Sequence, residues 1–275
     1  MGVCSEIQTF LSKSKTITKA SIKLSKQCKA VIANYIGKEN DGRKNGEHWF
    51  LDSYLSHGRE VVVDVGANKG DWSKAALDAG PEGPEDMRLY SYEPDPRIVD
   101  VLKDQFQSSE NVCVRSVAVG ESVGKMTLFL NQESTELTSA TPMSEEECVR
   151  HETRVTTLDE EVKENGLDHI DLLKIDVEGY ERSVLEGASS LLESESVSCI
   201  QFEYGRNWIR AGATLYSVVE KLRGYGFSVY LLRPECLRKI RFDEVGEYFS
   251  YSNYVAVHDS AEDQLKPLIH PKPLL

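Results

Sequence analysis

The chain has 275 residues, of which 40% are apolar, and its formal net charge at pH 7 is −13. This length and apolar content suffice for one large or two small domains with a hydrophobic core, which excludes a globally disordered chain. No stretch reaches the roughly 18 to 20 apolar residues of a membrane span, and the N-terminus lacks an apolar signal core. The six cysteines form no CxxC pair, so we expect a cytoplasmic protein in a reducing compartment.

The charge is unevenly distributed along the chain. Residues 1–44 carry a net charge of +6, which leaves −19 for residues 45–275. An acidic body repels nucleic-acid backbones and suits a neutral or cationic ligand, so we expect no nucleic-acid partner. For the basic extension, residues 1–45, we favour surface helices that dock on the body through Val31, Ile32, Tyr35 and Ile36. Weak contact with an anionic membrane surface and organelle targeting are the alternatives.

From residue 47 onward, helix-like and strand-like stretches alternate. A leading helix has its apolar face within residues 49–55 and is ended by Gly58. The strands expected next span residues 61–65, 88–93 and 112–119, with an added β element at 124–131. Between the second and third strands, Asp95 is expected to cap a helix whose first turn contains Pro96.

The second half repeats this rhythm after a polar segment, residues 132–150, that we expect to be a mobile loop. The strands expected here span residues 170–177, 197–202, 227–232 and 251–258, and the helices span residues 180–192 and 214–225. Strands separated by helices imply a parallel sheet with right-handed crossovers. The last two strands have no clear helix between them, which predicts an antiparallel pair at one edge. We count one domain, residues 46–260, followed by an extended proline-containing tail, residues 261–275.

The sequence VVVDVGANKGDWS, residues 61–73, is typical of a buried strand that runs into a glycine-containing turn and a helix. Open α/β sheets bind ligands at such a strand end. A dinucleotide site requires the pattern GxGxxG, but Asn68 and Asp71 occupy the second and third glycine positions, and Lys69-Gly70 reverses the Gly-Lys of a phosphate-binding loop. Asp64 and Asp71 instead make the turn acidic, which suits a positively charged ligand without phosphates.

Glu93 ends the next predicted strand, 27 residues after Gly66. A carboxylate at this position can accept hydrogen bonds from both ribose hydroxyls of a nucleoside. Together with the acidic turn, it indicates S-adenosylmethionine, a cationic nucleoside without phosphates. The alternative is that Asp64 and Glu93 only cap neighbouring backbone amides. Their occurrence at two adjacent strand ends favours the ligand.

Five motifs, within about residues 60–257, resemble the FkbM-type methyltransferases. They are DVGANKGDW from Asp64, YEPD from Tyr92, AVG from Ala118 followed by Gly124, TLD from Thr157 and KIDVEGYERSVLEG from Lys174. The resemblance implies a class I methyltransferase (Rossmann-like) α/β fold, with a seven-stranded, mostly parallel sheet and helices on both faces. It also implies methyl transfer from S-adenosylmethionine, usually to a hydroxyl of a sugar or secondary metabolite. By this matching the cofactor contacts would be Asp64, Gly66, Ala67, Asn68, Gly70, Trp72 and Glu93, with Val117 and Ala118 beside the adenine.

The acidic strand end Lys174-Ile-Asp-Val-Glu-Gly179 is expected to carry the chemistry. Side chains alternate along a strand, so Lys174, Asp176 and Glu178 would project to one side. Burial of an unpaired charge costs about several kcal/mol, so these groups must pair or line a wet cavity. We expect Lys174 to pair with a carboxylate and Asp176 to contact the cofactor or the substrate. Glu178 is either catalytic or a cap for the helix that follows.

An alcohol acceptor requires a base that removes its proton as the new bond forms. Asp176 is the first candidate, and its replacement by Asn is expected to abolish turnover. Glu203 in the stretch QFEYG is the second candidate, whereas His151 and His169 are isolated and less favoured.

Other functions remain open at this point. A cluster of four carboxylates could hold Mg²⁺, namely Asp171, Asp176, Glu178 and Glu203. The sequence has no dedicated metal spacing, however, and we expect no metal. A nicotinamide-dependent oxidoreductase and a non-catalytic scaffold are the alternatives to a methyltransferase. The acceptor is expected to be a small molecule or a glycan, on which Trp208 and Tyr204 could stack unless they fill the core.

Overall fold

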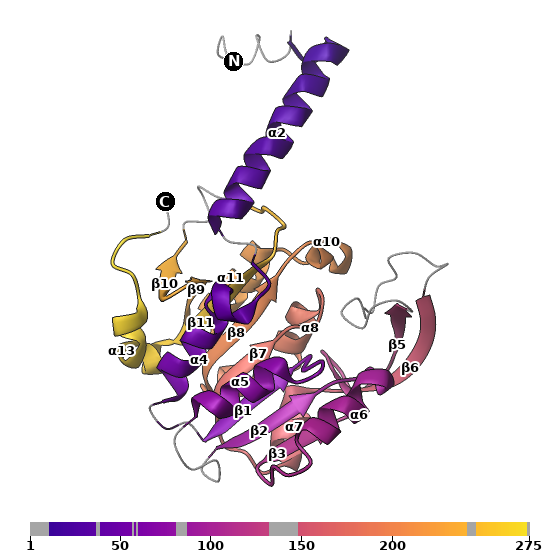
Figure 1. Ribbon diagram of the computed structural model, residues 1–275, viewed down its shortest axis with the longest axis vertical. Helices are drawn as coiled ribbons and strands as arrows, with labels where there is room; N and C mark the ends of the chain where they lie inside the picture. The colour runs from indigo at the N-terminus through magenta and orange to yellow at the C-terminus, as the bar shows by residue number, and fades with distance from the viewer. Residues whose placement is uncertain are drawn as a thin grey trace. The chain divides into compact units, whose positions relative to one another are not determined.

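The computed structural model describes residues 11–36, 39–56, 58, 60–80, 87–131, 148–240 and 246–273. It divides into two compact units, Met1–Lys38 and Glu39–Leu275. In the first unit, α2 (Lys15–Ile36) is one continuous helix (Figure 1). On this helix Ile36 is buried, whereas Val31 and Tyr35 are 67% and 50% exposed. The docking of the basic extension on the body stays a prediction.

An eight-stranded sheet forms the centre of the second unit, in the order β10-β9-β11-β8-β7-β1-β2-β3 (Figure 1). Its strands are β1 (Val61–Val65), β2 (Arg88–Tyr92), β3 (Val112–Arg115), β7 (Ile170–Ile175), β8 (Val197–Tyr204), β9 (Phe227–Arg233), β10 (Cys236–Lys239) and β11 (Ser252–His258). The pairings from β3 to β8 are parallel, and β11 is antiparallel to both β8 and β9. All five residues of β1 are buried. Because alternate side chains point to opposite faces, both faces of the sheet are covered.

The sheet has eight strands, whereas the sequence predicted seven. The additional strand, β10, pairs with β9 in an antiparallel hairpin that turns at Pro234 and Glu235. It is short and carries two basic residues, which is typical of an edge strand and weakens its hydrophobic signal. The predicted antiparallel pairing of β9 with β11 is confirmed, but β11 lies between β8 and β9 rather than at the edge.

Helices surround this sheet. They are α3 (Gly42–Asn45), α4 (Glu47–Leu55), α5 (Asp71–Ala79), α6 (Pro96–Gln105), α7 (Leu158–Glu164), α8 (Glu181–Glu186), α9 (Ser189–Glu193), α10 (Asn207–Ala211), α11 (Leu215–Gly224) and α13 (Glu262–Leu265). The α4 and α5 helices pack one hydrophobic cluster against the sheet, with Phe50, Trp72 and Leu172 among its buried members. As predicted, the Asp95 side chain accepts a hydrogen bond from the Arg97 amide and so caps α6. Within the described residues, no helix is both long and apolar enough to cross a membrane.

Two expectations about local structure are wrong, and a third lies mostly outside the described residues. The predicted strand at residues 112–119 divides into β3 and β4 (Ala118–Val119), and β4 belongs to a second sheet with β6 (Cys148–Thr156) and β5 (Gly124–Asn131). The predicted loop, residues 132–150, falls mostly outside the described residues, and its last three residues begin β6. The predicted helix at residues 180–192 is two helices, α8 and α9, separated by Gly187 and Ala188.

The tail was predicted to be extended because of its prolines, but it forms short helical turns. These are η2 (Asp259–Ala261), α13 and η3 (Lys266–Leu268). Pro267 lies in the first turn of η3, where the missing amide hydrogen costs nothing, and Leu265 is fully buried. The tail is thus anchored to the second unit by apolar packing.

Candidate active site

A cavity of about 1120 Å³ lies at the carboxyl ends of β1, β2, β7 and β8. Its wall comes from the turns after β1 and β7, the ends of β2 and β8 and part of residues 117–128. Residues within 40–52 and Tyr251 complete the wall. This is the edge at which open α/β sheets bind ligands.

The turn after β1 brings two backbone segments into close contact. Gly66 has φ +84°, and a Cβ atom on it would lie 1.8 Å from the carbonyl oxygen of Asp176, so only glycine fits. The amides of Gly66 and Ala67 donate to the Tyr92 carbonyl at 2.9 and 3.0 Å. The Asp176 amide donates to the Val65 carbonyl at 2.9 Å. These bonds fix the ends of three neighbouring strands relative to one another.

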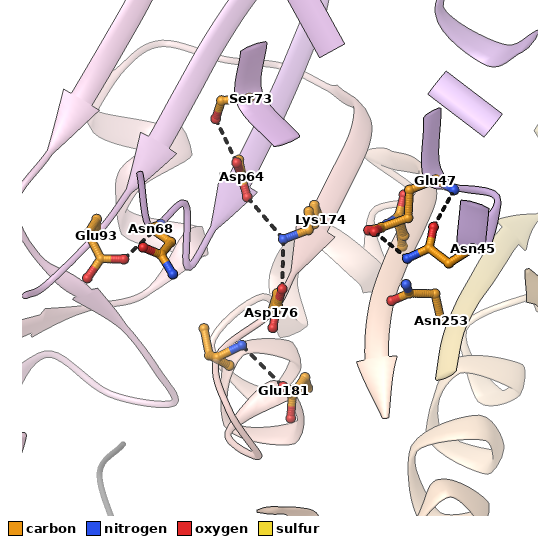
Figure 2. Close-up of polar contacts among 12 residues, drawn as sticks. Asn45, Glu47, Asp64, Asn68, Ser73, Glu93, Lys174, Asp176, Glu181 and Asn253 are labelled. Carbon is orange, nitrogen blue, oxygen red and sulfur yellow. Dashed lines mark hydrogen bonds and ion pairs between the residues drawn. The ribbon is translucent and has the colours of Figure 1, made fainter. Parts of the chain in front are cut away.

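Glu93 is buried at the end of β2 and lines the cavity. Its Oε2 accepts from the Asn68 amide at 2.9 Å (Figure 2). Its Oε1 accepts from the Asp95 amide at 2.7 Å. Burial raises the pKa of Glu93 to about 7, although these two amides oppose the shift. The capping alternative raised by the sequence is therefore observed. Each carboxylate oxygen has a second lone pair, so capping leaves acceptor capacity for a ligand hydroxyl.

A network of polar and charged side chains lies beneath the turn after β1. Ser73 Oγ donates to Asp64 at 2.6 Å, and Lys174 Nζ lies 3.7 Å from Asp64 Oδ1 and 3.0 Å from Asp176 Oδ2 (Figure 2). Burial lowers the pKa of Lys174, but the carboxylates of Asp176 and Asp64 more than offset this, so its amine stays protonated. The predicted ion pair of Lys174 is confirmed. Asp64 is fully buried and does not line the cavity, whereas Lys174 and Asp176 do.

In the turn after β7, Glu178 does not lie where the alternation of side chains predicted. Glu178 has φ +55° and so leaves the alternation of the strand, and its carboxylate accepts a hydrogen bond from the Asn207 amide group. Glu181 Oε1 accepts from the backbone amides of Val177 and Gly179 at 3.1 and 3.2 Å. Glu178 thus does not cap the following helix, whose N-cap Tyr180 has no side-chain cap hydrogen bond; Glu181 instead binds amides of the preceding turn. Burial raises the pKa of Glu181 to about 8.

Glu203 lies near the end of β8 and faces the cavity. Burial raises the pKa of Glu203 well above its usual value, and the carboxylates of Asp176 and Glu178 raise it further. Within the part of the chain that the structure describes, no group donates a hydrogen bond to this carboxylate. Asp176, by contrast, is held by Lys174.

Tyr251, which sequence reasoning missed, lies beside these carboxylates. Its hydroxyl accepts from Asn45 Nδ2 at 3.3 Å and from Asn253 Nδ2 at 3.1 Å. Burial, with the nearby Glu47 and Glu203 carboxylates, raises the pKa of Tyr251 above its usual value. The hydroxyl therefore keeps its proton, and because it already accepts two hydrogen bonds, it is left to donate one. The sequence did contain a signal for Tyr251. Because the last strand was predicted to be antiparallel, the residues at its start lie at the same edge of the sheet as the carboxyl ends of the parallel strands.

Glu47, at the start of α4, was also missed. Its Oε1 accepts from Gln201 Nε2 at 2.6 Å and its Oε2 from Asn45 Nδ2 at 2.7 Å. Glu47 is 9% exposed and lines the cavity, and burial raises its pKa. No local pattern could predict the pairing of Glu47 with Gln201, because 154 residues separate them.

The cavity gathers ten of the twelve residues that the sequence suggested for the site. These are Gly66, Ala67, Asn68, Trp72, Glu93, Val117, Ala118, Asp176, Glu178 and Glu203. Besides Asp64, the exception is Gly70, which precedes α5 and packs against Leu102 and Phe106 of the neighbouring helix and its end.

The remaining candidates lie elsewhere. Trp208 and Tyr204 are buried against each other, with ring centroids 5.1 Å apart, so they fill the core and do not line the cavity. Asp171 lies at the opposite end of β7, where it accepts hydrogen bonds from the Glu60 and Val61 amides at 2.9 and 3.0 Å. The four-carboxylate magnesium cluster is therefore not formed. Neither His151 nor His169 lines the cavity.

Two buried polar atoms on the cavity wall indicate a polar ligand. Asn68 Oδ1 and Trp72 Nε1 are buried and have no hydrogen-bond partner among the described residues. An unpaired buried polar atom costs about 1 to 3 kcal/mol, so a ligand that pairs with these atoms would be stabilised. Asn68 lies beside Glu93, whose carboxylate accepts its backbone amide, and the Trp72 ring lies beside Lys174, with 5.6 Å between Nζ and the ring centroid.

The sequence model of the Methyltransferase FkbM domain matches residues 64–229, which is more than half of the chain. The chain belongs to the FkbM methyltransferase family. Its mostly parallel sheet, with eight strands and helices on both faces, is the class I methyltransferase fold. The matched FkbM region holds Glu93, Asp176 and Glu203, whereas Glu47 and Tyr251 lie outside it.

Individual relatives of this FkbM-family chain are distant. The 2-O-methyltransferase NoeI of Sinorhizobium fredii is 24% identical over 159 residues, which cover 53% of this chain and 64% of NoeI. The match thus spans less than two thirds of that relative. The methyltransferase FkbM structure from Methylobacillus flagellatus has 15% identity and a TM-score of 0.46, covering 72% of this chain and 44% of its own. The precorrin-6y C5,15-methyltransferase of Geobacter metallireducens has 13% identity and a TM-score of 0.43, with coverages of 77% and 87%.

Proposed function

We propose that this FkbM-family chain transfers the methyl group of S-adenosylmethionine to a hydroxyl oxygen of a small molecule or a sugar. The observation that carries the proposal is the meeting of two features in one cavity. One is the turn after β1 with Glu93, and the other is Glu203, a carboxylate without a hydrogen-bond donor among the described residues. The relative named as a 2-O-methyltransferase supports an oxygen acceptor.

The residues around the turn after β1 would hold the cofactor. Glu93 would accept hydrogen bonds from the ribose hydroxyls, and Val117 and Ala118 would form the apolar wall beside the adenine. Asn68 and Trp72 would pair their buried polar atoms with the ligand. When bound, S-adenosylmethionine supplies a methyl group that its sulfonium already activates.

A nicotinamide dinucleotide fits this turn poorly. Its pyrophosphate needs free backbone amides, but those of Gly66 and Ala67 already donate to the Tyr92 carbonyl. The carboxylates of Asp71 and Glu93 on the same wall would also repel phosphates. These contacts favour a cationic nucleoside over a dinucleotide.

Glu203 is the best candidate for the base that removes the acceptor's proton. A carboxylate with a raised pKa is a stronger base than one held by an ion pair, and Asp176 is held by Lys174 at 3.0 Å. The order of the two candidates proposed from the sequence is therefore reversed. Glu203 must be ionised to act, so the rate would fall as the pH decreases through its raised pKa.

Tyr251 would orient the acceptor oxygen toward Glu203. Its hydroxyl is held by Asn45 and Asn253 and can donate one hydrogen bond into the cavity. An alcohol that accepts from Tyr251 and donates to Glu203 keeps a further lone pair on its oxygen for the methyl group. Such alignment of reacting atoms can supply a large share of the rate enhancement.

The test is transfer of labelled methyl from S-adenosylmethionine to a panel of acceptors. The panel contains methyl glycosides of hexoses and deoxyhexoses, catechol and an RNA transcript, with calorimetric titration of S-adenosylmethionine and of NAD alongside. We expect binding of S-adenosylmethionine and transfer to a hydroxyl compound, without transfer to RNA. Activity is expected to survive exhaustive chelation, since the carboxylates of the cavity do not form the suggested metal cluster.

Two results would contradict the proposal. Heat from NAD titration but none from S-adenosylmethionine would favour the oxidoreductase. Binding of S-adenosylmethionine without transfer to any compound of the panel or of a metabolite extract would favour a non-catalytic scaffold.

A further inference from the structure

The helix α2 has a composition unlike that of the FkbM domain. Its 22 residues include Lys15, Lys19, Lys23, Lys26 and Lys29 and no acidic residue. Residues 45–275, in contrast, carry a net charge of −19. The chain is acidic overall, but this helix has a net positive charge, and the proposed methyl transfer does not use it.

The lysines and the apolar side chains of α2 lie on opposite faces. An α-helix turns by about 100° per residue, so the five lysines fall within an arc of about 120°. The opposite face carries an apolar stripe that we define as Ile17, Ala20, Leu24, Cys28 and Val31. Ile22, Ala30 and Ala33 are exceptions, because they lie among the lysines.

The apolar stripe is open to solvent. Ile17, Leu24 and Val31 are 40%, 61% and 67% exposed, and Cys28 is exposed as well. An isolated apolar side chain on a surface needs no explanation, but a continuous stripe along one helix face indicates an interaction surface. The observation points to a partner that buries the stripe and tolerates five lysines opposite it.

We infer that α2 binds flat on an anionic lipid surface, with its apolar stripe in the headgroup region and its lysines attracted by the lipid phosphates. An amphipathic helix with a lysine-rich polar face and modest overall hydrophobicity has this behaviour. The stripe runs from Ile17 to Val31, which at 1.5 Å per residue is about 21 Å, or about four turns of contact. Because it is not apolar enough to cross a membrane, it lies on the surface.

Two other occupants of the stripe fit less well. In a coiled coil with a second copy, Ile17, Leu24 and Val31 would be accompanied by Ala20, Gln27 and Asn34 in one heptad register, or by Ser21, Cys28 and Tyr35 in the other. Neither set contains Leu, Ile or Val, the residues that a stable coiled-coil seam prefers. A nucleic acid would pair with the lysines but leave the apolar stripe exposed.

The test is co-sedimentation of the full-length chain with vesicles. Phosphatidylcholine vesicles with and without phosphatidylserine are compared at low and at raised salt. We expect binding to the anionic vesicles that weakens with salt, because screening reduces the attraction of the lysines. Vesicle binding requires neither cofactor nor acceptor, so the result does not depend on the proposed methyl transfer.

Three variants separate the two faces of α2. Replacement of Ile17, Leu24 and Val31 by Gln is expected to weaken partitioning by roughly 100-fold, because the stripe loses its apolar contact. Replacement of Lys19, Lys23 and Lys26 by Gln is expected to weaken it by about tenfold on anionic vesicles only. The control replaces three exposed lysines of the second unit, Lys103, Lys163 and Lys272, by Gln and should bind as the parent does. Glutamine preserves helix propensity, and circular dichroism verifies the helix content.

The inference is overturned by any of three results. The first is that the parent chain does not bind anionic vesicles, and the second is that both α2 variants bind these vesicles as well as the control does. Alternatively, sedimentation without lipid could show a dimer that the apolar-stripe variant loses, which would assign the stripe to a second copy of the chain.

Discussion

The two ends of the cavity, which we call the cofactor end (around Glu93) and the acceptor end (around Glu203 and Tyr251) after their proposed roles, are built in different ways. At the cofactor end, the contacts are between backbone groups or between a side chain and a nearby backbone: Glu93 accepts the amides of Asn68 and Asp95, and Gly66 lies against the Asp176 carbonyl. At the acceptor end, side chains contact side chains across long stretches of sequence. The Asn45 amide group, for example, donates to the Tyr251 hydroxyl across 206 positions.

This difference indicates which residues of the site can change without disturbing the fold and which cannot. A site made of backbone contacts is fixed by the fold, because a change in it moves the strands themselves. A site made of side chains on rigid strands can change its shape and charge while the sheet remains intact. The cofactor end is therefore expected to be common to the family, and the acceptor end, which includes residues outside the matched region, to determine the specificity of this chain.

The largest effect is expected from Gly66→Ala at the cofactor end. The added Cβ would overlap the Asp176 carbonyl at 1.8 Å, and the backbone has φ +84°, so β1 and β7 would have to move apart. We expect a loss of at least about 3 kcal/mol in unfolding free energy and no binding of S-adenosylhomocysteine. Urea unfolding and calorimetry measure both. Gly224→Ala is the control, because nothing lies within 4 Å of its added Cβ.

At the acceptor end, Glu203→Gln is expected to remove catalysis without harming cofactor binding. Loss of a general base lowers kcat by roughly 10²- to 10⁴-fold. Single-turnover methyl transfer measures this loss, and calorimetry with S-adenosylhomocysteine verifies that the cofactor end is intact. Asp176→Asn is the comparison. If the Asp176 variant loses kcat and the Glu203 variant retains it, Asp176 is the base and our assignment is wrong.

Tyr251→Phe is expected to have a smaller effect, because it removes one hydrogen bond to the acceptor and no charge. We expect kcat/KM for the acceptor to fall by roughly tenfold, which corresponds to about 1.4 kcal/mol, with unchanged affinity for S-adenosylhomocysteine. Tyr216→Phe is the control, because that tyrosine is 56% exposed and lies outside the cavity. Equal effects of the two substitutions would exclude Tyr251 from acceptor binding.

The features of the fold that the sequence predicted correctly depend on local interactions. The strand Val61–Val65 and the helix that starts at Pro96 were both predicted because their signals, β-branched residues and an Asp-Pro cap, lie within the elements themselves. The edge strand β10 and the division of residues 112–119 were missed, because edge position and sheet membership depend on distant partners. The extended tail was wrong because apolar packing of Leu265 outweighed the signal of the prolines.

The same distinction applies to the site. The turn after β1 and Glu93 were found because a short motif specifies them, and Lys174 was correctly expected to pair with a carboxylate. Glu47 was missed because its role depends on Gln201, and Tyr251 because its role depends on Asn45. A single sequence does not record such long-range pairs.

Glu181→Gln sharpens the comparison, because Glu181 and Glu93 both accept two backbone amides but only Glu93 lines the cavity. Burial raises the pKa of Glu181 from 4.5 to about 8 in the folded chain, so the folded state holds this proton more tightly than the unfolded state. The resulting stability is fully present below pH 4.5 and is lost as the pH rises through about 8. Between these limits the parent should lose roughly 1 kcal/mol of unfolding free energy per pH unit that the variant, whose substituted side chain does not titrate, does not lose. Urea unfolding at a series of pH values tests this.

The affinity for S-adenosylhomocysteine should change in Glu93→Gln but not in Glu181→Gln. A weakened affinity in both variants would mean that the turn after β7 also shapes the cofactor end.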